Sequence, residues 1–212
     1  MKELSQAKMR LADVLDRHDR AELALAMLID VIVACRDSGC FDEIAVISND
    51  SEVFWQVREA GAKPLAEPAT LSGLNESLTF GQRYLARRVA VDELIVLPAD
   101  VPMILAADIR DVVDALNVAE PRVVLVRSRD NGTNALARRP PEIVAMHYGR
   151  NSADAHRADA DSNGVPVTEL VNERLAFDVD SPDDLAALPS LAVGAATAGW
   201  LAARASYSAG GG

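Results

Sequence analysis

The sequence contains little cysteine, few aromatic residues and no apolar run long enough to cross a membrane. Its 212 residues include two cysteines, Cys35 and Cys40, and only 4% are phenylalanine, tryptophan or tyrosine. Two cysteines are too few for a disulfide framework, and they have no partners for a zinc site. We therefore expect two buried or idle thiols in a cytoplasmic protein.

No segment has the features of a targeting signal. The start of the chain is charged and amphipathic rather than apolar, so we expect no signal peptide in this sequence. The most apolar late stretch, residues 191–204, is too short for a bilayer, so we expect a terminal packing helix there and no membrane contact. This helix also makes a homodimer plausible. Residues 1–204 are expected to form one domain, and residues 205–212 a disordered tail.

Basic residues are scarce. The 21 lysines and arginines are outnumbered by 32 acidic residues, and the net charge of -11 argues against nucleic-acid binding, which requires a basic face. Three cations nevertheless gather in the opening stretch MKELSQAKMRL, namely Lys2, Lys8 and Arg10. A local cationic pocket of this kind can bind a small anion even in an acidic protein.

Helical and strand patterns alternate along the chain. The sequence predicts helices over residues 19–36, 53–60, 78–89 and 108–117, and strands over 43–48, 63–67, 93–100, 122–128 and 175–180. This order indicates a single α/β domain, with a mostly parallel sheet covered by helices on both faces. Ligands of such sheets lie beyond the carboxyl ends of the strands. The segments to consider are therefore 48–50, 98–100, 130–133 and 178–180.

In LPADVPMI, Asp100 stands where a buried strand ends, between Pro98 and Pro102, which stiffen the turn. A carboxylate held in this way is a suitable ligand for Mg²⁺. The alternative is that Asp100 caps the following helix, and this segment alone does not distinguish the two.

The segment FDVDSPDDL offers Asp178 and Asp180 at the end of the last predicted strand, where their spacing puts both on one face. Residues 181–184 have the pattern of a helix start, with Ser181 as N-cap and Pro182 in the first position. The two acids that follow Pro182 then stabilise the helix dipole. Asp178 and Asp180 are left without such a role.

Two polar segments present backbone N–H groups and hydroxyls. DNGTNAL (130–136) is predicted to be a tight turn, in which Gly132 and Thr133 form either an anion-binding nest or an ordinary loop. In HYGRNSADAH (147–156), Gly149 exposes the backbone and Ser152 lies near a helix start, where anions bind. Alternatively, Ser152 is a plain N-cap, and His156 is a satisfied surface or core histidine.

Together, KELSQAKMRL, LPADVP, GTNAL, HYGRNSADAH and DVDSPDDL resemble the guanylyltransferases of coenzyme F-420 biosynthesis, the CofC or FbiD family. The similarity runs in order from Lys2 to about Ala198. It implies a Rossmann-like GT-A domain, as in nucleotide-diphospho-sugar transferases. It also implies that GTP is joined to 2-phospho-L-lactate, phosphoenolpyruvate or 3-phospho-D-glycerate, with release of pyrophosphate.

The same resemblance implies roles for individual residues. The triphosphate-binding and catalytic cations are expected to be Lys8 and Arg10, with Lys2 as a third cation. The expected Mg²⁺ ligands are Asp100, which is also catalytic, and Asp180, supported by Asp178. The expected contacts to the phospho-acid are Thr133, Gly149 and Ser152. Asn75, in GLNESL, is expected to contact the nucleotide.

Two other functions stay open. A MobA-like nucleotidyltransferase for molybdopterin or a sugar phosphate would carry a Gly-Gly-x-Ser-x-Arg loop, and the sequence has AKMRL in its place. A catalytically silent GTP-binding module on the same fold would use the acidic residues only as helix caps.

The resemblance also implies a central first strand that ends in a Val-Lys pair. Met1-Lys2 stands at the position of that pair, and the strand itself is missing. We therefore expect a start codon placed too late or a truncated form.

Overall fold

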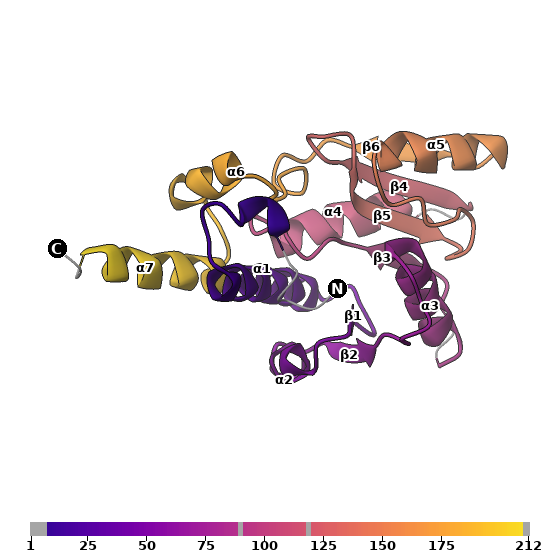
Figure 1. The fold of residues 1–212 in the computed structure, drawn as a ribbon. Helices are drawn as coiled ribbons and strands as arrows, with labels where there is room; N and C mark the ends of the chain where they lie inside the picture. The colour runs from indigo at the N-terminus through magenta and orange to yellow at the C-terminus, as the bar shows by residue number, and fades with distance from the viewer. Residues whose placement is uncertain (1–7, 89–90, 118–119, 210–212) are drawn as a thin grey trace.

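The computed structural model describes residues 8–88, 91–117 and 120–209 (Figure 1). Its α-helices are α1 (Arg17–Ser38), α2 (Ser51–Glu59), α3 (Leu74–Ala86), α4 (Ala106–Leu116), α5 (Ser152–Ser162), α6 (Pro182–Ala187) and α7 (Ala195–Ala209), and two 3-10 turns are η2 (Met9–Leu11) and η3 (Leu188–Ser190). Its strands are β1 (Ala45–Ser48), β2 (Lys63–Ala66), β3 (Leu94–Val96), β4 (Arg122–Arg127), β5 (Thr133–Arg139) and β6 (Val167–Leu170).

The strands form two sheets. β1 and β2 pair in parallel, and a four-stranded sheet has the order β3-β5-β4-β6. β4 and β6 run parallel, whereas β5 runs antiparallel to β3 and β4. The predicted α/β class is confirmed, with one reversed strand in the larger sheet. The expectation of a missing first strand concerns the start of the chain, which lies outside the described residues.

Helices cover both faces of the larger sheet (Figure 1). On one face Val124 and Val126 of β4 pack in a cluster with α1 and α4. On the other face Val123 and Leu125 pack against α5 and the segment before it. Because successive side chains of a strand point to opposite faces, burial on both sides explains why β4 is a continuous apolar run.

The two cysteines are free thiols that lie in or beside this core. Cys35 of α1 is buried, and burial raises its pKa to about 12, whereas Cys40 is half-buried. Cys35 is therefore protonated at neutral pH and unreactive as a nucleophile, in agreement with the expectation of idle thiols.

Two sequence predictions about the later strands are wrong. Residues 175–180 do not form a strand, because residues 173–176 form a turn and β6 takes the place beside β4 instead. β6 was not predicted from the sequence. The predicted turn at 130–136 is confirmed only in its first half, because β5 begins at Thr133.

The C-terminal helix α7 packs on α1. The carboxylate of Asp30 accepts the backbone N–H groups of Ala196 and Thr197, both at 2.9 Å, and so caps the start of α7. α7 continues through Ala205 to Ala209, a stretch expected to be a disordered tail. Within the described chain no single helix could cross a membrane; only α6–η3 and α7 together, bent by 97°, have the length and composition.

Candidate functional site

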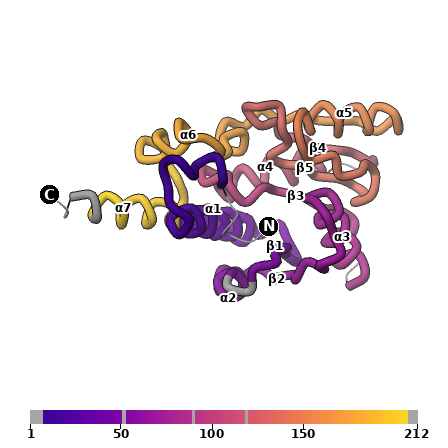
Figure 2. The backbone as a smooth tube through the Cα atoms, viewed as in Figure 1, coloured from indigo at the N-terminus to yellow at the C-terminus, as the bar shows by residue number. Residues whose placement is uncertain are grey.

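The turn that carries Lys8 and Arg10 is fixed between α6 and the start of α1 (Figure 2). η2 buries Leu11 completely, and Leu15 packs beside it. The Lys8 carbonyl accepts the N–H of Leu11 at 2.9 Å. Lys8 itself has a φ of 50°, in the left-handed region that is costly for a residue with a Cβ. A strained backbone therefore holds the base of the Lys8 side chain at this position.

Lys8 bridges two of the predicted carboxylates. Its Nζ contacts Asp100 Oδ2 and lies 3.0 Å from Asp180 Oδ1, while Arg10 Nη1 lies 3.2 Å from Asp180 Oδ2. The Lys8 side chain is 10% exposed and that of Arg10 is 75% exposed. These residues and Met27 of α1 line a cavity of about 310 Å³.

The ammonium of Lys8 is kept charged by its partners. Burial alone would lower the pKa of Lys8, but Asp100 and Asp180 outweigh burial and raise it. The cavity therefore contains two cations, Lys8 and Arg10, that pair with the carboxylates of Asp100 and Asp180.

Asp100 does not cap the following helix. The N-cap of α4 is Leu105, whose N–H donates to Asp108 Oδ2 at 2.9 Å. The carbonyl of Asp100 instead accepts the N–H of Val179 at 3.1 Å, which brings the segment 178–180 beside it. The capping alternative for Asp100 is thus excluded by geometry.

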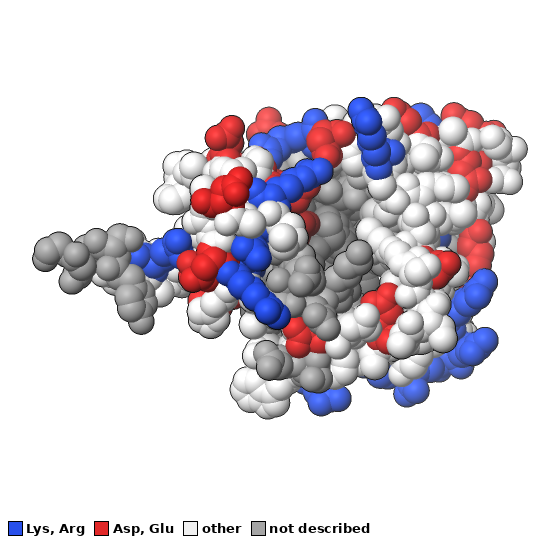
Figure 3. Space-filling model, viewed as in Figure 1, with Lys and Arg blue, Asp and Glu red and all other residues white. Residues whose placement is uncertain are grey.

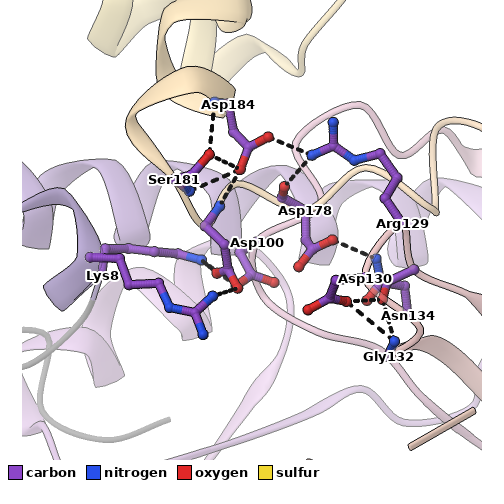
Figure 4. A network of polar contacts seen from close by, with 12 residues as sticks. Lys8, Asp100, Arg129, Asp130, Gly132, Asn134, Asp178, Ser181 and Asp184 are labelled. Carbon is purple, nitrogen blue, oxygen red and sulfur yellow. Dashed lines mark hydrogen bonds and ion pairs between the residues drawn. The ribbon is translucent and has the colours of Figure 1, made fainter. Parts of the chain in front are cut away.

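The third predicted carboxylate, Asp178, points toward β5 (Figure 4). Its Oδ1 accepts the Asn134 side-chain N–H at 3.2 Å. Burial raises the pKa of Asp178. The hydrogen bond from Asn134 opposes this shift, and the nearby charges of Asp100 and Asp180 add to it. The three acids therefore converge closely enough for their charges to repel.

At a β-bulge in β5, the side chains of Thr133 and Asn134 contact different partners. Val126 of β4 lies opposite Ala135, but Arg127 lies opposite Thr133, so Asn134 is the extra residue of β5. Asn134 donates to Asp178 and to the Leu175 carbonyl, whereas the Thr133 hydroxyl faces α5. Neighbouring residues at the bulge thus contact Asp178 on one side and a second polar cluster on the other.

This second cluster consists of Thr133, Ser152 and His156, all buried. Ser152 Oγ lies 3.0 Å from Thr133 Oγ1, and His156 Nδ1 lies 3.0 Å from the same oxygen. The N-cap of α5 is Asn151, with a φ of 56°, so Ser152 is the first helical residue and the N-cap alternative for it is wrong. His156 is fully buried, in agreement with the expectation of a satisfied histidine, here in the core.

The remaining predicted residues lie on the chain around this cluster. Gly149 is exposed, with a φ of 144° that favours glycine, and a Cβ there would meet no atom within 4 Å. Asn75 of α3 bonds the Tyr148 main chain twice, through Nδ2 to the carbonyl at 3.0 Å and through Oδ1 from the N–H at 2.8 Å. Asn75 therefore fixes the segment that carries Gly149. Lys2 lies outside the described residues.

Several residues that sequence reasoning did not select hold the site together (Figure 4). Arg129 donates to Asp184 Oδ1 at 2.6 Å and to the Asp178 carbonyl at 3.1 Å. Ser181 is the N-cap of α6, as predicted, and Asp184 accepts its N–H at 2.8 Å. Burial would raise the pKa of Asp184, but the bonds from Ser181 and Arg129 lower it to about 2. No local pattern around Arg129 or Asn134 indicated these contacts.

The buried state of His156 leads to a prediction about stability. Burial, helped by His147 and Arg138 and opposed by the Ser152 main chain and Asp159, lowers the pKa of His156 from 6.5 to about 4. Between pH 6.5 and about 4 the unfolded chain binds a proton on this ring, whereas the folded chain does not. The free energy of unfolding should therefore fall by about 3 kcal/mol as the pH drops from 6.5 to about 4.

Denaturant unfolding of the wild type and His156→Asn across this range checks the effect. The variant should lose stability less steeply, whereas His18→Gln, which alters an exposed histidine, should follow the wild-type slope. Parallel curves for the wild type and His156→Asn would show that His156 titrates normally in the folded state.

Acidic and basic side chains are interspersed among the described residues on the face in Figure 3, without a continuous basic surface there.

Comparison with known proteins identifies relatives over most of the chain. The model of the family described as "Guanylyl transferase CofC like" matches residues 1–201. The phosphoenolpyruvate guanylyltransferase of Sphaerobacter thermophilus is 40% identical over 185 residues, covering 86% of each chain. The 2-phospho-L-lactate guanylyltransferase of Haloarcula marismortui is 36% identical over 200 residues, covering 93% of this chain and 86% of its own.

The fold has neighbours among solved structures. A candidate nucleotide-diphospho-sugar transferase of Desulfovibrio desulfuricans G20 superposes with a TM-score of 0.70 at 14% identity, covering 89% of this chain and 83% of its own. At this identity the likeness concerns the fold alone, and it agrees with the predicted nucleotide-diphospho-sugar transferase-like architecture.

The predicted guanylyltransferase function agrees with the names of both sequence relatives. The family match and the extent of the sequence similarity go well beyond the short motifs that first indicated a resemblance. The chain belongs to the family of CofC-like guanylyl transferases.

Proposed function

We propose that this chain joins GTP to a three-carbon phospho-acid and releases pyrophosphate, with phosphoenolpyruvate as the first acid to test. The observation that carries the proposal is that two successive residues at a bulge in β5 reach two polar groups. Asn134 bonds Asp178, which lies close enough to Asp100 and Asp180 of the cavity to feel their charges, and Thr133 bonds Ser152 in the buried hydroxyl cluster. Phosphoenolpyruvate comes first because the relative from Sphaerobacter thermophilus is named for it.

In the proposed reaction a phosphate oxygen of the acid attacks the α-phosphorus of GTP. The new P–O bond joins the two phosphates, the bond between the α-phosphorus and the bridging oxygen to the β-phosphate breaks, and pyrophosphate leaves with the electron pair. The attacking oxygen is already ionised, so no protein nucleophile or general base is required. Catalysis then depends on positioning and on charge neutralisation.

Lys8 and Arg10 are proposed to neutralise the triphosphate. Lys8 keeps its charge although its side chain is 10% exposed, which suits a cation that meets phosphate in a desolvated cavity. Arg10, at 75% exposure, suits the outer phosphates. Asp100 and Asp180 hold both cations in place before GTP arrives.

The carboxylates fit Mg²⁺, which is proposed to accompany the triphosphate. Asp100 and Asp180 present hard oxygens around one cation position, where Lys8 Nζ lies, and repulsion from Asp178 favours further positive charge. The described residues contain no group of three His, Cys, Asp or Glu side chains arranged for a metal. Mg²⁺ commonly uses one or two carboxylates and takes its other ligands from phosphates and water. When bound, it would withdraw charge from the α-phosphate.

Thr133, Ser152 and Gly149 are proposed to receive the phospho-acid. The two hydroxyls lie beside the start of α5, and Gly149 leaves its main chain uncovered by a side chain. Asn75 is proposed to act on the nucleotide side only indirectly, because both ends of its amide already bond the Tyr148 main chain.

Mass spectrometry tests this function. The purified chain is offered GTP and Mg²⁺ with phosphoenolpyruvate, 2-phospho-L-lactate or 3-phospho-D-glycerate, each in a separate reaction. We expect a guanosine diphospho-acid in at least one reaction, most abundantly with phosphoenolpyruvate. Unchanged GTP in all three reactions would reject the proposal, and a product with another acid alone would reject phosphoenolpyruvate.

Arg10→Ala should mainly weaken GTP binding. Its ion pair with Asp180 is exposed, so the expected loss is about tenfold in affinity for GTP, with kcat changed less than about threefold. Titration calorimetry with GTP and Mg²⁺ measures the affinity. The matched control is Arg36→Ala, which removes one exposed arginine at the far end of α1. Equal affinities in the Arg10 and Arg36 variants would exclude Arg10 from the triphosphate site.

A further inference from the structure

The hydrogen bonds of the buried cluster have a defined direction. His156 Nε2 accepts the backbone N–H of His147 at 2.9 Å, so in the neutral ring the proton is on Nδ1. Burial keeps this ring neutral at physiological pH. Nδ1–H therefore faces Thr133 Oγ1, with the Ser152 main chain as a second partner, and the histidine cannot act as an acceptor for the hydroxyl pair.

The donor to His156 is itself held firmly. Asp159 Oδ2 accepts the N–H of Ala145 at 2.8 Å and lies 2.9 Å from His147 Nε2, so the segment 145–147 is tied to α5. The Tyr148 ring packs edge-on against His156, with centroids 5.1 Å apart. The His156 ring therefore has no room to turn over and exchange its two nitrogens.

One hydroxyl proton of the cluster is left without an acceptor. Thr133 and Ser152 carry two hydroxyl protons, and their mutual bond uses one of them. If Ser152 donates, Thr133 Oγ1 has both lone pairs filled, by Ser152 and His156, and its own proton is left over. If Thr133 donates, the Ser152 proton is left over. No hydrogen bond between described side chains takes up the remaining proton.

We propose that His156 is a positioning residue that turns the Thr133–Ser152 pair into a hydrogen-bond donor for the anionic group of the phospho-acid. This inference rests on the proposed function. An anion can only accept hydrogen bonds. A cluster with one unused hydroxyl proton therefore favours the ionised substrate over a neutral group of the same shape. His156 acts through Thr133 and does not touch the substrate.

Two variants divide the roles of the two ring nitrogens. His156→Asn keeps an N–H donor near the Nδ1 position, whereas His156→Gln keeps a polar group near the Nε2 position and loses the donor to Thr133. Steady-state kinetics of the full chain, with GTP, Mg²⁺ and the most active of the three acids, gives separate KM values. In His156→Gln we expect the KM for the acid to rise by about tenfold to a hundredfold. In His156→Asn it should rise by less than about threefold. The KM for GTP should stay within about twofold in both.

A merely structural histidine predicts the opposite order. Glutamine conserves more of the side-chain volume and can still accept the His147 N–H, so it would then be the milder replacement. A double-mutant cycle adds a second test. In a Thr133→Val background, His156→Gln should raise the KM for the acid by less than about twofold further, because its target is already gone. If the two substitutions instead raise the KM for the acid by factors that multiply in the double variant, the inference is overturned.

The outcomes separate this inference from the proposed function. Absence of product from the wild type with all three acids would refute the function. An active wild type in which His156→Gln is no worse than His156→Asn would refute only the role of His156. If His156→Gln does not fold, Thr133→Ser and Thr133→Val decide: serine should keep the KM for the acid within about threefold, and equal KM values in both would refute the donor role.

Discussion

Replacing Asp100 with asparagine is expected to reduce guanylyl transfer by about a thousandfold and to leave the fold intact. The asparagine has nearly the same shape but no charge, so it can neither hold Lys8 electrostatically nor serve as a good ligand for a hard cation. The folded state should lose only about 1 kcal/mol, because Lys8 keeps Asp180 at 3.0 Å and the crowding of like charges around Asp178 is relieved.

The measurement is kcat with saturating GTP and acid, together with denaturant unfolding of the same preparation. Asp42→Asn is the matched control, because it removes one exposed carboxylate in the turn after α1. The control should match the wild type in both measurements. Turnover of Asp100→Asn within about tenfold of wild type would refute the role of this carboxylate.

Lys8→Met is expected to have the second largest effect, a loss of about a hundredfold in kcat/KM for GTP. The methionine keeps an unbranched side chain in the cavity but leaves Asp100 and Asp180 facing each other without their shared cation. GTP must then approach Asp100 without a partner cation, while Asp180 keeps only its exposed ion pair with Arg10. The folded state should lose about 1–2 kcal/mol at pH 7, less than for a fully buried pair because Asp180 is 40% exposed.

Lys8→Arg shows whether a point charge is required. Its planar, wider head does not fit a position that Lys8 Nζ shares between two carboxylates, so recovery should be partial. Calorimetry with GTP and stopped-time assays separate binding from turnover. A Lys8→Met enzyme that is more stable than wild type and binds GTP normally would mean that the lysine is only a counterion of the empty site.

The sequence predicts one part of the site through topology. Asp100 follows β3, as the rule for ligand sites in α/β sheets requires. Asp180 lies with it beside Lys8, although residues 175–180 form no strand, so that rule alone does not explain its place. The helix start at Ser181 was also predictable, since capping is local chemistry.

The rest depends on contacts between distant segments. Asn134 reaches Asp178 because of a bulge in β5, which local sequence does not reveal. Residues 175–180 have a strand-like apolar pattern without being a strand, because Leu175 is buried against one face of the larger sheet and Val179 is buried in the cluster around Leu11. β6 is short and only half-buried, so its pattern is weak. The direction of the His156 bonds depends on a main-chain N–H nine residues earlier.

Phosphorus-31 NMR of a single reaction tests the central claim most directly. The chain is incubated with GTP, Mg²⁺ and phosphoenolpyruvate, and all phosphorus species are followed together. Attack at the α-phosphorus predicts that the α-, β- and γ-signals of GTP decline as pyrophosphate and a pair of coupled diphosphate signals appear in equal amounts. Formation of GDP with inorganic phosphate, or an unchanged GTP spectrum in the presence of each of the three acids, would contradict it.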